Sequence, residues 1–142
     1  MPYVTLEQLE DRYGTSMLVA LTDRGAVASG TVDPDTVARV LTDTDAVIDG
    51  HISARYVVPV VGTDTLLTDI AGAIAIYKLH RHEPDEKVTR DYKDALASLV
   101  SIARGQVRLS IEGVVPAETG GTGAQFVDRE RPFTAKNLKG LI

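Results

Sequence analysis

The longest amphipathic pattern in the chain runs from Asp33 to Pro59. Asp33 is a favoured N-cap residue, and Pro34 suits the first helical position, because its missing N–H would have no helical partner there. Apolar residues then recur with helical spacing for about six turns, at Val37, Val40, Leu41, Val47, Ile48, Ile52 and Tyr56. Because Pro59 disfavours helical backbone in the residue before it, the pattern predicts a helix that ends by about Val57.

Two short helices are predicted before this segment. Thr5 stands three residues before Gln8, the spacing of a capping box, and Gly14 is a suitable residue to end the first helix. Apolar residues at helical spacing predict a second helix over residues 15–22. Residues 23–32 are small and Gly-rich, which is typical of a loop.

Two longer helices are predicted after Pro59. The first starts at residue 64 or 65 and runs to about His82, and it is apolar nearly all round. Such a helix is typically buried in the middle of a bundle. Asp85 and Glu86 then occupy the first turn of the last helix, where acidic side chains suit the helix dipole, and Gly105 is expected to end it.

The pattern changes beyond this last helix. Residues 106–112 alternate apolar and polar positions, which predicts one half-buried strand that pairs with residues 125–127 or with a neighbouring subunit. Residues 118–124 are Gly-rich and are expected to form a flexible link. The tail that follows has apolar side chains but is too short to form its own core. We therefore expect it to dock on another surface, preferably that of another chain.

Together these elements predict a mainly α protein, a compact bundle of about four to five helices with a short β element and an extended C-terminal arm. A chain of 142 residues is expected to form one core. We place the helical domain at residues 1–112 and the Gly-rich link with the arm at residues 113–142. The chain has no cysteine, so neither disulfides nor thiolate metal sites stabilise it.

Charge and hydropathy narrow the classes of partner. The net charge of -5 and the pI near 5.1 argue against general affinity for nucleic acid or anionic membranes. The last seventeen residues differ, with four basic and two acidic side chains, which suggests contact with an acidic surface. The N-terminus lacks the features of a signal peptide, and the apolar run 70–77 is too short to cross a membrane. We expect a soluble protein made in the cytosol.

No grouping of residues predicts an active site. His80 and His82 are two positions apart and do not share a helix face, so with Glu83 they are better interpreted as solvated helix-end residues than as metal ligands. The acidic residues 43–49 lack the glycine and closing Glu of a calcium loop, and residues 120–123 lack the lysine of a phosphate loop. We expect no catalytic residue, no cofactor and no metal.

Arg55 is the unusual residue of the long helix, because on a helical wheel it lies nearly in line with the buried Ile48 and Leu41. One interpretation is structural: the arginine pairs with Asp45, Asp49 or another carboxylate, or bonds the carbonyls that end its own helix. The other is that it also contacts a neighbouring subunit, since arginine is enriched at interfaces.

Three motifs stand in order along the chain. The first is Y-x-T-x-x-x-L-x-x-R-(Y/F)-G, matched at Tyr3, Thr5, Leu9, Arg12, Tyr13 and Gly14. The second, IDGYL-x-x-RY-x-x-P, is matched over residues 48–59 with His51 in place of the aromatic residue. The third, R-x-F-(T/S)-x-x-x-L-K-G, is matched at Arg131, Phe133, Thr134, Leu138, Lys139 and Gly140. With these motifs nearly the whole chain resembles the Mu-like phage head–tail joining proteins.

The resemblance implies a structural virion protein, a connector (neck) subunit that forms a ring of about twelve copies under the portal. Its partners would be other copies of itself, the portal protein, a tail-side neck or tail terminator protein, and DNA that passes without sequence-specific binding. It would be located at the head–tail junction of the virion, and in the host cytoplasm before assembly, with no membrane contact. We assign the subunit or portal interface to Arg55, Tyr56, Arg131, Phe133, Leu138, Lys139 and Leu141.

Two other classes of function stay open at this point. The chain is alternatively a monomeric adaptor or binding domain that uses its C-terminal tail as a recognition peptide. A metal-dependent enzyme built on His80, His82 and Glu83 is a third and weaker hypothesis.

Overall fold

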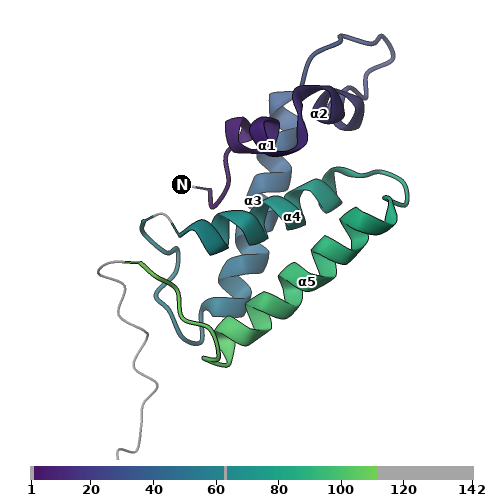
Figure 1. Ribbon diagram of the computed structural model, residues 1–142. Helices are drawn as coiled ribbons and strands as arrows, with labels where there is room; N and C mark the ends of the chain where they lie inside the picture. The colour runs from purple at the N-terminus through teal and green to yellow at the C-terminus, as the bar shows by residue number, and fades with distance from the viewer. Residues whose placement is uncertain (1, 63, 112–142) are drawn as a thin grey trace, which may run out of the picture.

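Five α-helices account for most of the domain in the computed structural model, which describes residues 2–62 and 64–111 (Figure 1). They are α1 (Leu6–Tyr13), α2 (Thr15–Thr22), α3 (Pro34–Ile52), α4 (Thr65–Leu79) and α5 (Glu86–Ala103). The predicted mainly α bundle is therefore confirmed. The predictions that concern the Gly-rich link and the arm lie outside the residues that the structure describes.

The centre of the bundle is α4, as its apolar sequence predicts. It packs against α3, α5 and α1, and Figure 1 shows it passing between the α1–α2 pair and α5. Eight of its residues are buried: Leu67, Ile70, Ala71, Gly72, Ile74, Ala75, Ile76 and Leu79. On the α5 side, the rings of Tyr77 and Tyr92 stack with centroids 3.9 Å apart. Small residues in α4 let its neighbours approach closely from several directions.

The predicted helix starts are correct, and those of α1, α3 and α4 are set by a local side chain, whereas α2 follows Gly14 without a side-chain cap. Thr5 and Gln8 form the reciprocal capping box at the start of α1, with bonds of 3.2 and 2.9 Å. Asp33 caps α3 by accepting from the Asp35 N–H at 3.1 Å. Asp64 caps α4 in the same way.

The long helix α3 ends five residues earlier than predicted, at Ile52 rather than Val57. The N–H groups of Arg55 and Tyr56 both donate to the Ile52 carbonyl, each at 2.9 Å, so the chain leaves the helix in a turn. This turn still brings the Tyr56 ring into the core, where it is 4% exposed. The apolar pattern continued past the helix because Tyr56 is buried from a turn, which helical periodicity alone does not reveal.

The end of α4 is also earlier than predicted, at Leu79 instead of about His82. His80 takes up extended backbone, and its Nδ1 lies 2.7 Å from the Ile76 carbonyl. Arg24 donates from Nη2 to the Leu79 carbonyl at 2.7 Å. Side chains from outside the helix thus satisfy carbonyls that a longer helix would have used.

The predicted strand is not formed over residues 106–111, which follow an irregular path. The Leu109 N–H donates to the Tyr56 hydroxyl at 3.2 Å, and the Ser110 N–H donates to Asp64 Oδ2 at 2.8 Å. Leu109 and Ile111 pack against the core, as the alternation predicts, but Val107 is exposed. Here side chains take the place of a partner strand as hydrogen-bond acceptors. The proposed strand partner, residues 125–127, is not among the described residues.

Across the described part of the chain, none of the helices is both long enough and apolar enough to cross a membrane.

Candidate functional site

Arg55 lies in the turn after α3 and packs against the end of α5. Gly105, just beyond α5, has a φ of +78°, and a Cβ built there would overlap the Arg55 guanidinium. The guanidinium therefore occupies the space that a side chain at position 105 would need. Only glycine meets both requirements of this position without strain, because it tolerates positive φ and leaves the space open.

The carboxylates considered as partners for Arg55 are bonded to another residue. Asp45 accepts from the Tyr3 N–H at 3.0 Å, and Asp49 accepts from the Tyr3 hydroxyl at 2.5 Å. Within residues 2–62 and 64–111, the Arg55 side chain has no hydrogen bond or ion pair. It is half-buried, so its position depends on packing against Gly105. Its predicted role at a subunit interface stays a prediction.

The surroundings of Arg55 form a basic, apolar surface, which we call the basic end. It comprises Arg55 and Val57 from the turn after α3, and Arg104, Val107 and Arg108 from the chain after α5. The contacts of Arg55 with Gly105 and of Tyr56 with Leu109 hold these two segments together. Val57 is 69% exposed and Val107 is 37% exposed, and Arg104 and Arg108 are exposed as well, so these two segments present both apolar and cationic groups to solvent. Such a combination suits a protein contact.

Tyr56 differs from Arg55 because its ring is inside the domain. Its hydroxyl accepts from Leu109, and Asp64 accepts from Ser110, so the two side chains fix the segment that leads into the arm. Asp64 is itself only 7% exposed, and its other oxygen accepts from the N–H groups at the start of α4. Tyr56 is therefore a buried residue that holds the segment after α5 in place, and its ring is not on the surface. Arg131, Phe133, Leu138, Lys139 and Leu141, the other predicted interface residues, lie outside the described residues.

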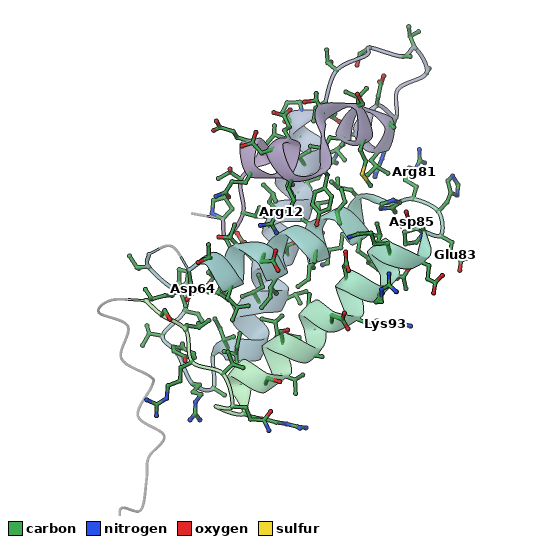
Figure 2. The ribbon with its side chains drawn as sticks, in the orientation of Figure 1. Arg12, Asp64, Arg81, Glu83, Asp85 and Lys93 are labelled. Carbon is green, nitrogen blue, oxygen red and sulfur yellow. The ribbon has the colours of Figure 1, made fainter. Side chains whose placement is uncertain are left out.

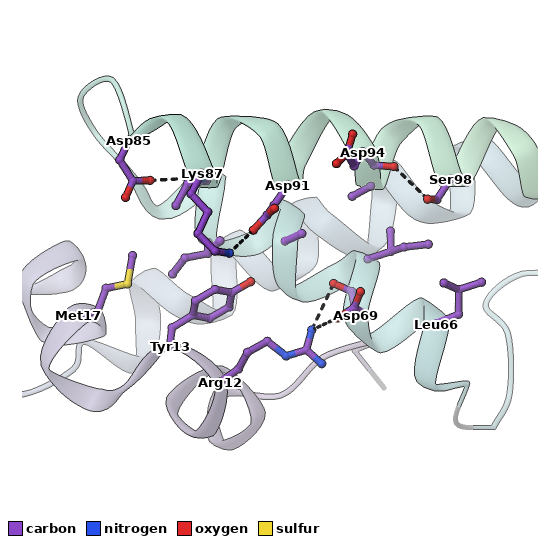
Figure 3. Close-up of a pocket in the computed structure, with 15 residues that line it drawn as sticks. Arg12, Tyr13, Met17, Leu66, Asp69, Asp85, Lys87, Asp91, Asp94 and Ser98 are labelled. Carbon is purple, nitrogen blue, oxygen red and sulfur yellow. Dashed lines mark hydrogen bonds and ion pairs between the residues drawn. The ribbon is translucent and has the colours of Figure 1, made fainter.

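A groove of about 640 Å³ runs between the α1–α2 pair and α5, with α4 as its floor, and we call it the α4 groove. Figure 3 shows Arg12 reaching from α1 to Asp69 on α4, and Lys87 reaching Asp91 on α5. Gly72 lies beneath Arg12, and a Cβ there would be 3.2 Å from Arg12 Nη1. The apolar lining includes Tyr13, Met17, Ile70, Ala73 and Val88.

Glu83, one of the residues considered for a metal site, lies at the end of the domain opposite Asp64 (Figure 2). His80 is bonded to the Ile76 carbonyl, while His82 and Glu83 are exposed. In residues 2–62 and 64–111, no three His, Cys, Asp or Glu side chains come together as metal ligands would. The arrangement at the basic end and in the α4 groove suits contacts with other proteins.

Sequence reasoning missed the role of Tyr3, which joins the N-terminus to α3 and to the turn before α4. Its hydroxyl accepts from the Val60 N–H at 3.0 Å while donating to Asp49. Burial and the bond to Asp49 raise the pKa of this hydroxyl. The motif at the start of the chain contains Tyr3, but no local pattern indicates which carboxylate it meets, because its partners are more than forty residues away.

Asp45→Asn should make the protein more stable than the parent at pH 7. Burial, and then the nearby Asp49, raise the pKa of Asp45, although the Tyr3 N–H partly opposes this. The folded state thus binds the Asp45 proton more tightly than the unfolded state. The parent gains stability as pH falls through the raised pKa toward the ordinary value near 3.8.

The advantage of Asn should therefore shrink over this acid range, as measured by urea unfolding of both proteins at several pH values. Asp43→Asn, on the exposed side of α3, is the matched control. A difference between Asp45→Asn and the parent that grows toward low pH would contradict the argument.

The structure is a small, mainly helical domain with two distinct surface features, the basic end and the α4 groove. Comparison with known proteins is consistent with this class: the model of the family described as Bacteriophage Mu, Gp36 matches residues 3–127, and the chain belongs to that family. It is 30% identical to gene product J of Escherichia phage Mu over 142 residues, which is the whole of both chains. It is 26% identical to the Mu-like prophage FluMu protein gp36 of Haemophilus influenzae over 140 residues, 99% of this chain and 98% of the relative. The resemblance to Mu-like phage proteins is thereby confirmed.

Proposed function

We propose that this protein is a head–tail connector subunit of a Mu-like tailed phage or prophage, a structural component that assembles as a ring under the portal. The observation that carries the proposal is that one small domain has two unlike surfaces, the basic end and the α4 groove. The basic end is cationic and apolar, whereas the domain as a whole is acidic, with sixteen Asp and Glu against eleven Lys and Arg in residues 2–111. A ring requires two different, complementary surfaces on each copy.

The proposed role needs neither catalysis nor a cofactor. In this role the subunit contacts its neighbours, the portal protein above and a tail-side neck or tail terminator protein below. An acidic ring does not hold the DNA that passes through it, because the phosphates are repelled. The protein would lie at the head–tail junction of the virion and in the host cytoplasm before assembly. Membership of the Gp36 family supports the phage context.

Light scattering and negative-stain imaging, with and without the cognate portal protein, test this proposal. We expect closed rings of one size, either alone or on portal assemblies. The ring should weaken at high salt, since contacts between exposed charges are screened. A strictly monomeric protein that ignores portal assemblies would count against the connector role and favour the monomeric adaptor.

A further inference from the structure

The α4 groove combines an apolar floor with an acidic edge. Its apolar lining includes the half-buried Tyr13 and Met17 from α1 and α2, the buried Ile70 on the α4 floor, and the buried Val88 from α5. Its volume of about 640 Å³ lies within the range of roughly 300–1,000 Å³ that is typical of ligand pockets. A groove of this kind accepts apolar side chains on a chain segment that also carries positive charge.

The acidic edge of the groove has carboxylate oxygens that can still accept hydrogen bonds from cations. Asp69 pairs with Arg12, and Asp91 pairs with Lys87 at 2.6 Å. Among the described residues the Asp94 carboxylate has no hydrogen-bond partner, and it is exposed. Asp85 uses one oxygen to cap α5, accepting from Val88. Four carboxylates against two cations leave the lining of the groove negative.

The C-terminal arm, residues 126–142, has the complementary composition. It carries four basic and two acidic side chains, and its apolar side chains lie between and beyond the basic ones. Phe133, Leu138 and Leu141 are each within three residues of a lysine or arginine. An apolar side chain of the arm can therefore reach the floor while a neighbouring cation meets Asp94 or Asp85.

We propose that the α4 groove of each copy binds the C-terminal arm of a neighbouring copy. This rests on the proposed function, since a closed ring needs each copy to hold the next. The fourteen residues from Glu112 to Gln125 span at most roughly 50 Å when extended. A domain of this size is about 35 Å across. The link is thus long enough for the arm to reach the next subunit.

The absence of natural cysteine allows a direct test by cross-linking full-length chains. One variant carries Ser98→Cys in the groove, and a second carries Asn137→Cys in the arm between Lys136 and Leu138. The two are mixed and treated with a short bis-maleimide. We expect a covalent heterodimer in a yield at least about fivefold above that of the control pair, because docking raises the effective concentration of the two thiols.

The control pair replaces Ser98→Cys by Thr42→Cys on α3. Thr42 lies outside the groove, and its hydroxyl bonds the carbonyl four residues earlier, as that of Ser98 does. Equal yields for the two pairs would overturn the assignment of the groove. A link found only within one chain, in the double variant Ser98→Cys with Asn137→Cys, would overturn the neighbouring copy as the source of the arm.

Charge reversal gives a second readout. Asp94→Lys should lower the cross-linking yield of the groove pair severalfold, whereas Asp43→Lys on the exposed side of α3 should not change it. If Asp94→Lys leaves the yield unchanged, Asp94 does not hold the arm. Rings that form without groove cross-links would leave the proposed function standing and overturn this inference. Groove cross-links without rings, alone or on the portal, would leave this inference standing and overturn the proposed function.

Discussion

Asp64→Ala should destabilise the protein by about 2–4 kcal/mol, because one buried carboxylate serves two segments. Asp64 Oδ1 accepts from the N–H groups of Leu66 and Leu67 at 2.8 and 3.2 Å, which caps α4. Asp64 Oδ2 accepts from the Ser110 N–H at 2.8 Å, which holds the segment before the arm. Loss of the carboxylate leaves these donors without an acceptor at a site that is 7% exposed.

Two matched variants separate these contributions. Asp85→Ala removes a cap that bonds only the Val88 N–H from an exposed position, and it should cost about 1 kcal/mol. Asp64→Asn keeps an oxygen for the cap but offers an NH₂ group to Ser110, so its stability should be intermediate. Urea unfolding gives the free energies, and hydrogen exchange of the Ser110 amide should accelerate in both Asp64 variants. Equal costs for Asp64→Ala and Asp85→Ala would contradict the double role of Asp64.

The helix starts and the ends of the two short helices could be predicted from the sequence, whereas the ends of α3 and α4 could not. Thr5, Asp33 and Asp64 each bond N–H groups two or three residues ahead, so the signal and its effect lie in the same short window. The end of α4 depends on Arg24, which is 55 residues from the Leu79 carbonyl that it bonds. A single sequence carries no local mark of such a distant partner.

The segment after α5 illustrates the same limit. Its alternation correctly predicts that Leu109 and Ile111 face the core, whereas Val107, the first apolar position of the pattern, is 37% exposed. The alternation does not reveal what accepts from the Leu109 and Ser110 N–H groups, and the acceptors are the side chains of Tyr56 and Asp64, 53 and 46 residues away. Period-two patterning reports which side of a segment is buried, and a strand needs a partner backbone in addition.

Of the residues at the basic end, only Arg55 had been singled out from the sequence. Arg55 stood out as a charge in an apolar stripe, and the structure places it half-buried beside Gly105. Its neighbours at the basic end come from the chain after α5, which the helical wheel of α3 cannot include. The α4 groove was not predicted, because it is formed by residues of four helices whose packing brings them together.

Gly105→Ala should destabilise the protein by about 1–2 kcal/mol and displace Arg55. The cost arises because a residue with a Cβ is strained at a φ of +78°. The new Cβ also overlaps the guanidinium, which can move away because it is the end of a flexible side chain. Thermal unfolding measures the first effect, and ring formation measures the second. Gly50→Ala, within α3 and open on its outer side, is the matched control and should be neutral or stabilising.

Arg55→Ala should instead leave the free energy of unfolding within about 1 kcal/mol of the parent, because the structure assigns this side chain no hydrogen bond among the described residues. We expect it to reduce ring formation, since it removes a cation from the basic end. In the double variant with Gly105→Ala, the stability cost should stay close to that of Gly105→Ala alone, because the backbone strain remains when the overlap is gone. Arg90→Ala, an exposed arginine on α5, should assemble normally. If Arg55→Ala forms rings as well as Arg90→Ala does, Arg55 has no part in assembly, and the basic end acts through Arg104, Arg108 and the exposed valines.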